Sequence, residues 1–121
     1  MHAEGKPFID FDGLRRHVAD YDSLFLKLLQ LFLEQAPLWI DELNEAFASG
    51  DAVLVRQVCH KIKGGAGTLQ ASAIIEAAAD LGRLAAADDL ALAEAGRVRL
   101  LAMIEQTVAF VRQSEYFRDA F

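Results

Sequence analysis

The stretch Cys59-His60-Lys61-Ile62-Lys63-Gly64-Gly65-Ala66-Gly67-Thr68-Leu69 combines a histidine, two lysines and three glycines. The apolar residues in and before it recur every three or four positions, which predicts a helix and not a strand. These residues are Val55, Val58, Cys59, Ile62, Ala66 and Leu69. At 100° per residue, His60 lies about 140° from the centre of that apolar stripe. The stretch therefore predicts an amphipathic helix that turns His60 towards solvent.

The glycines of this stretch predict a bare surface around His60. Gly64 and Gly67 lie on its side of the helix, about 180° and 120° from the stripe centre, and Arg56 and Lys63 flank them. A glycine inside a helix costs about 1 kcal/mol relative to alanine, so the three together cost about 3 kcal/mol. Close approach of another molecule to the backbone is a common reason to keep glycines on an exposed helix face.

The rest of the chain reads as further amphipathic helices. The expected helices are a short one capped by Asp10, one over about 22–48, one from Asp51 to about Leu69, one capped by Ser72, and one from Asp88–Asp89 to about Glu115. Pro37 interrupts one backbone hydrogen bond of the long helix. The apolar stripe keeps its phase on both sides, so we expect one bent helix, with a break near Ala36 as the alternative. Gly50 is the expected C-terminal stop.

These segments predict an all-α fold, namely an antiparallel up-down four-helix bundle with a short extra N-terminal helix. We expect a single domain over 1–121, with a loose tail over 1–8 and a core over about 22–115. The inward residues of the last two helices are expected to be Ile75, Ala78, Leu81 and Ala85, and then Leu90, Ala93, Arg97, Leu101, Ile104, Val108 and Val111. Phe11, Leu14 and Val18 share one face of the short helix, whereas 116–121 cannot be placed.

Composition narrows the setting. No signal peptide and no run of about 18 apolar residues is visible, so no membrane span is expected. The single cysteine, Cys59, lies on the apolar stripe, which predicts a buried inert thiol and a reducing, cytoplasmic setting. A net charge of −6 argues against a nucleic-acid partner. A monomer is expected, because one bundle uses all the apolar stripes.

Charge is unevenly distributed along the chain. Segment 51–70 holds three basic residues and one acidic residue, a net charge of +2, so the remainder carries −8. The basic region thus surrounds His60 on an otherwise acidic protein. This distribution favours an anionic partner surface or a phosphate at that place.

Several chemistries are disfavoured by the residue pattern. His2, His17 and His60 show no metal-ligand spacing with one another, and the Glu-x-x-His pairs of di-metal bundles are absent. The glycines lack P-loop order, so no nucleotide site is expected. His60 remains as a nucleophile that can form a covalent phospho-imidazole. Lys63, one turn on, can reach the phosphoryl group, and Gly64 leaves it unshielded.

The segment His60-Lys61-Ile62-Lys63-Gly64-Gly65-Ala66, followed by Leu69 and Ala71, resembles the His-x-x-Lys-Gly core of histidine-containing phosphotransfer (HPt) domains. The resemblance covers about 22–88. Its upstream part consists of Phe25-Leu26, Phe32, Pro37, Leu43, Ala46 and Asp51.

This resemblance implies a stoichiometric phosphocarrier and not an enzyme, without an ATP site or autokinase activity. His60 would accept phosphate from the aspartate of one receiver domain and pass it to another. Lys63 would steady the phosphoryl group, Gly64 would let the receiver approach, and the receiver would bring Mg²⁺. The implied partners are receiver domains of response regulators or a hybrid histidine kinase.

We expect the receiver to dock on the outward face of the His60 helix. That face would comprise Arg56, Lys61, Gly64 and Gly67, with Phe11 and Leu14 as an apolar rim. Two positions differ from the family pattern. Gln70 replaces a usual glycine, so we expect a different local turn. Gly82 replaces a usual Gln or Glu, so another group or water would orient His60.

Two other readings stay open. In the first, the chain is a non-catalytic bundle that binds a receiver-like partner through the glycine face without phosphate. The reading ranked lowest is the phosphorylated domain of a larger histidine kinase, since 121 residues leave no room for an ATP-binding domain.

Overall fold

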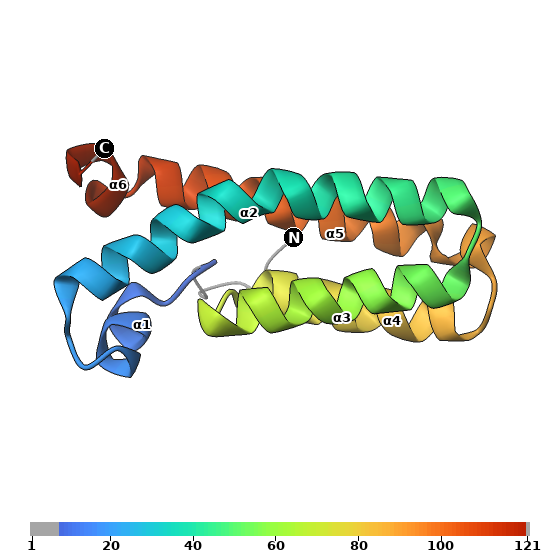
Figure 1. The fold of residues 1–121 in the computed structure, drawn as a ribbon, viewed down its shortest axis with the longest axis horizontal. Helices are drawn as coiled ribbons and strands as arrows, with labels where there is room; N and C mark the ends of the chain where they lie inside the picture. Colours follow the sequence, from blue (N-terminus) through green and yellow to red (C-terminus); the bar gives the residue numbers. More distant parts are fainter. Residues whose placement is uncertain (1–7, 121) are drawn as a thin grey trace.

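The computed structural model describes residues 8–120, with side chains described for residues 8–117. This part forms six helices: α1 (Phe11–His17), α2 (Asp22–Ser49), α3 (Ala52–Thr68), α4 (Ser72–Ala86), α5 (Leu90–Gln113) and α6 (Glu115–Ala120). The helices α2 and α4 each pack against both α3 and α5, so the four long helices enclose one core (Figure 1). The prediction of an all-α bundle is confirmed. Most of the expected loose tail lies outside the described residues.

The long helix α2 runs unbroken through Pro37 and bends along its length (Figure 1). Its buried residues are Phe25, Leu29, Phe32, Ala36, Trp39, Leu43 and Ala46, spaced three or four apart. Their packing stabilises both sides of the proline, so the alternative of two helices is wrong. Gly50 ends α2 with a φ of +72°, a left-handed conformation that costs glycine little.

The helix α3 is fixed at both ends by local backbone chemistry. At its start, Asp51 Oδ1 accepts hydrogen bonds from the backbone N–H groups of Val53 (3.0 Å) and Leu54 (3.3 Å). At its end, Gln70 has a φ of +56°. The turn thus takes up the left-handed conformation with a side chain in place, at a cost of about 1 kcal/mol. The chain therefore makes a left-handed turn after α3 although Gln70 stands where the family usually has glycine.

The buried faces of the last two long helices, α4 and α5, differ slightly from the predicted ones. Ser72 is the first residue of α4 and Ala71 is its N-cap, so the predicted serine cap is wrong. The buried set of α4 is Ala73, Ile74, Ala77, Ala78, Leu81 and Ala85, and that of α5 is Ala93, Leu100, Met103, Ile104, Thr107 and Val111. Ile75, Leu101 and Val108 are only half-buried. Each helix packs between two neighbours, so its buried face is centred between them.

The short helices α1 and α6 close one end of the bundle with aromatic rings. Phe11 stacks on Phe110, with 5.2 Å between ring centroids, and lies edge-on to Tyr116 at 5.1 Å. Leu14 is completely buried. Leu14 therefore cannot contribute to the predicted docking rim, because its side chain lies wholly in the core, whereas Phe11 is half-buried by its aromatic contacts and stays a prediction. Tyr116, unplaced from sequence, also packs on Phe25.

The Asp51 cap generates a stability prediction. Asp51→Ala leaves two backbone N–H groups of α3 without their acceptor and lowers the free energy of unfolding by about 1 kcal/mol. Asp51→Asn keeps an acceptor oxygen and loses at most a few tenths of a kcal/mol. Urea denaturation followed by circular dichroism measures both, and an equal loss in the two variants would show that the cap is unimportant.

Candidate functional site

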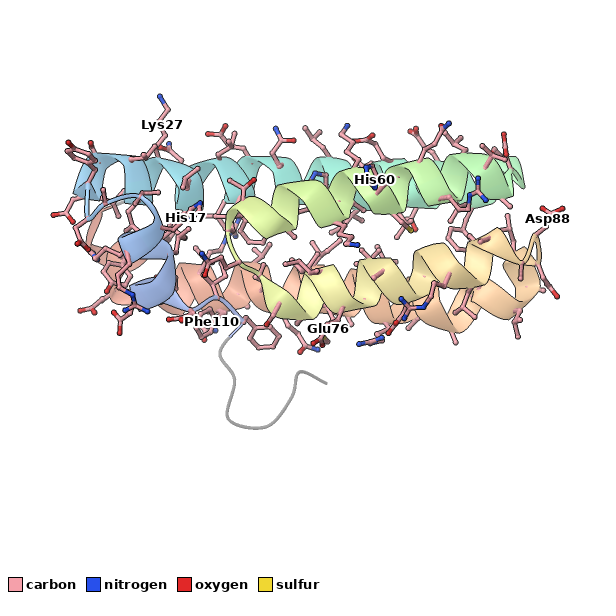
Figure 2. All side chains as sticks on the ribbon, turned by 90° about the horizontal axis from the view of Figure 1, so that it is seen from below. His17, Lys27, His60, Glu76, Asp88 and Phe110 are labelled. Carbon is pink, nitrogen blue, oxygen red and sulfur yellow. The ribbon has the colours of Figure 1, made fainter. Side chains whose placement is uncertain are left out.

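His60 lies in the middle of α3, on the exposed side of the helix (Figure 2). Arg56 and Lys63 are exposed on the same helix. The preceding residue, Cys59, points into the core and is buried, as the sequence predicts. Burial raises the pKa of the Cys59 thiol to about 11, so it stays protonated and unreactive at neutral pH. Of these two neighbouring side chains, only that of His60 is exposed to solvent.

The three glycines of α3 do different things. A Cβ added at Gly64 or Gly67 would meet no heavy atom within 4 Å. A Cβ at Gly65 would lie 2.5 Å from Cζ2 of Trp39, which no real contact allows. Gly65 therefore serves the packing of α3 on α2, a role that the sequence does not reveal. Gly64 and Gly67 have no such internal reason among the described residues and leave the surface beside His60 open.

A groove of about 320 Å³ runs between α3 and α4 beside His60. Small residues of α4 and cations of both helices line it. Its lining comprises Arg56, Cys59, His60 and Lys63 of α3 with Ala78, Ala79, Gly82, Arg83 and Ala86 of α4. Of the described residues that line it, none is acidic. The groove thus offers positive charge and space at the exposed imidazole.

Gly82 is not required by packing. A Cβ there would lie 3.8 Å from Cβ of Cys59, an ordinary van der Waals contact. A larger residue such as Gln or Glu would have room to extend into the groove. The glycine therefore leaves space beside His60 that a longer side chain would fill.

Lys61 lies on the opposite side of α3 from the groove. Its Nζ contacts both carboxylate oxygens of Glu42 on α2, each at 2.9 Å. This ion pair links the two helices and offsets the charge of Lys61. The positive charge near His60 therefore comes from the α4 side of α3, namely from Arg56 and Lys63, with Arg83 of α4 on the far wall of the groove.

A second groove, of about 250 Å³, lies between α2 and α3. Its lining is mostly apolar and comprises Leu28, Leu31, Phe32, Gln35, Trp39, Lys61, Gly65, Thr68 and Leu69. Leu31 is 48% exposed, and its α2 neighbours at seven-residue spacing, Leu24 and Leu38, are 43% and 52% exposed. We name Leu24, Leu31 and Leu38 the leucine stripe. Their spacing places them on one helix face and is the sequence signal that was missed.

Other site classes find no support in the described part of the chain. Residues 8–120 contain no group of three or more His, Cys, Asp or Glu side chains placed to hold a metal ion. None of the helices described here is long and apolar enough to cross a membrane.

The model of the Hpt domain family matches residues 27–110, which include His60 and most of the bundle. The chain belongs to the Hpt domain family. At the level of the family, this means histidine phosphotransfer in two-component signalling, by phosphocarriers that interact with receiver domains. Comparisons with curated proteins and with solved structures give no significant match.

Alanine substitution is expected to change the stability of this Hpt domain in opposite directions at the packed glycine, Gly65, and at the two open glycines, Gly64 and Gly67. Gly65→Ala forces its Cβ into Trp39 and lowers the free energy of unfolding by about 1 to 2 kcal/mol. Gly64→Ala and Gly67→Ala add helix propensity without a clash and raise it by about 0.5 to 1 kcal/mol. Thermal and urea unfolding measure all three. Equal shifts at the three positions would contradict this division.

Proposed function

We propose that this chain is a phosphocarrier in a two-component phosphorelay, with the phosphoryl group carried on His60 between aspartates of receiver domains. The observation that supports this most strongly is the open space at Gly64 and Gly67 beside the exposed His60. Both glycines cost helix stability, and their position is explained if a second protein must come close to α3 at this histidine.

The proposed transfer needs one nucleophilic nitrogen. The lone pair of a neutral imidazole nitrogen of His60 attacks phosphorus in the receiver's aspartyl phosphate. The N–P bond forms as the bond between phosphorus and the aspartate oxygen breaks, and the carboxylate leaves with the electron pair. The other ring nitrogen carries the imidazole proton, which then passes to water. Transfer to the next receiver runs the same exchange in reverse.

The cations beside His60 suit this chemistry. Phosphoryl transfer depends mostly on positioning and on positive charge near the phosphoryl oxygens. Lys63, one helical turn after His60, is exposed and lines the same groove. In this proposal Lys63 binds a phosphoryl oxygen, and Arg56, one turn before, adds to the local potential. The receiver supplies Mg²⁺.

The docking surface proposed for the receiver differs from the sequence prediction. It comprises the glycine face of α3, with Arg56, Gly64 and Gly67, and the leucine stripe of α2. The leucine stripe takes the apolar role first given to Phe11 and Leu14, and Lys61, paired with Glu42, lies between the two parts. Exposed apolar residues next to a bare helix face are typical of a protein-binding surface. The domain acts as a monomer that receives phosphate from a response regulator or a hybrid kinase.

Transfer of radiolabelled phosphate from a phosphorylated receiver tests this function. The wild-type chain gains an acid-labile label, and His60→Gln gains none. Gly64→Gln, which keeps the histidine but covers the open face, slows the transfer by about tenfold or more. Label on His60→Gln equal to that on the wild type would contradict the proposal.

The same variants address the non-catalytic alternative. Binding to the receiver that is lost in Gly64→Gln but accompanied by no label on the wild type would identify an interaction module that uses no phosphate.

A further inference from the structure

Arg83, on the far wall of the His60 groove, has an acidic neighbour on its own helix and also lines the groove. Arg83 lies on α4, 72% of its side chain is exposed, and it forms an ion pair with Asp80 one turn earlier. Asp80 also forms an ion pair with Arg99 of α5. One carboxylate thus holds two guanidinium groups, whereas Arg83 also lines the groove that contains His60 and Lys63.

The helical positions place Arg83 between these two environments. At 100° per residue, Asp80 lies about 60° to one side of Arg83, the side that faces α5. Ala79 and Ala86 lie about 40° and 60° to the other side, which faces α3 and the groove. These two alanines are small, so a change of rotamer carries the guanidinium from Asp80 into the groove without crossing a bulky side chain.

We propose that Arg83 is a phosphoryl-binding residue of this domain, and that it exchanges Asp80 for the phosphoryl group when His60 is phosphorylated. This inference rests on the proposed function of His60. The exchange costs little, because Asp80 keeps Arg99 and because exposed ion pairs contribute little to stability. An arginine suits the role, since its planar fork donates two parallel hydrogen bonds to phosphoryl oxygens.

This assignment also accounts for the space at Gly82. Gly82 precedes Arg83, and its missing side chain leaves the middle of the groove empty. Lys63 from α3 and Arg83 from α4 then face the phosphoryl group from opposite walls. Two cations match the charge of about −2 that a phosphoryl group carries when fully ionised.

The pKa of the phosphoryl group on His60 tests the inference directly. The chain is phosphorylated with potassium phosphoramidate or with a phosphorylated receiver, and the ³¹P signal is followed by NMR as a function of pH. A nearby cation favours the dianion, so Arg83→Gln raises the phosphoryl pKa by about 0.5 relative to the wild type. Arg83→Lys, which keeps the charge, recovers at least half of that difference.

The matched control is Arg112→Gln. It removes an exposed arginine of α5 that lines a different groove and has no ion pair with Asp80, so the phosphoryl pKa stays at the wild-type value. An unchanged pKa in Arg83→Gln, or equal rises in both variants, would overturn the role of Arg83. A wild-type chain that shows no phosphohistidine signal from either donor would overturn the proposed function of His60 itself.

Discussion

The contact between Trp39 and the backbone of α3 at Gly65 is the constraint on which the site depends. The indole ring occupies the space that a Cβ would need, so α3 lies close against α2 at this level. One turn earlier, the ion pair of Lys61 with Glu42 joins the same two helices. These contacts fix how α3 is rotated about its axis. Cys59 then faces the core and His60 faces solvent, on a helix whose position is fixed by packing.

Around that fixed histidine the chain separates its charges and its apolar residues. Arg56, Lys63 and Arg83 lie around the groove on the α4 side of His60, whereas Lys61 on the α2 side is paired with Glu42 of α2. Exposed leucines lie on α2, beyond the open face at Gly64. A receiver that approaches His60 would therefore meet apolar surface on one flank and a groove for the phosphoryl group on the other. In the proposed function, this separation would let docking and phosphoryl binding use different residues.

The sequence predicts much of this because hydrophobic periodicity and caps depend on local residues. The stripe that keeps its phase across Pro37 correctly indicates one helix, and Asp51 and Gly50 mark the turn between α2 and α3. The hydrophobic periodicity also correctly predicts that His60 faces outward. What it cannot supply is the identity of the neighbour on each face. Gly65 looks like Gly64 in sequence, and only the position of Trp39 separates them.

The same limit explains the errors at the ends of the bundle. The residue pattern of the short helix shows that Leu14 lies on its apolar face. It does not show whether that face meets the core or a partner. The position of Arg83 beside His60 likewise depends on how α4 packs against α3. Contacts between distant segments decide these roles, and no local pattern encodes them.

The most direct measurement of the central claim, that α3 presents a bare face for a receiver at His60, is an NMR titration. The ¹⁵N-labelled chain is mixed with a receiver domain that exchanges phosphate with it. We expect the amide shifts to change at His60, Gly64 and Gly67 and along the leucine stripe. Changes confined to α5 and α6, with α3 unaffected, would contradict the account.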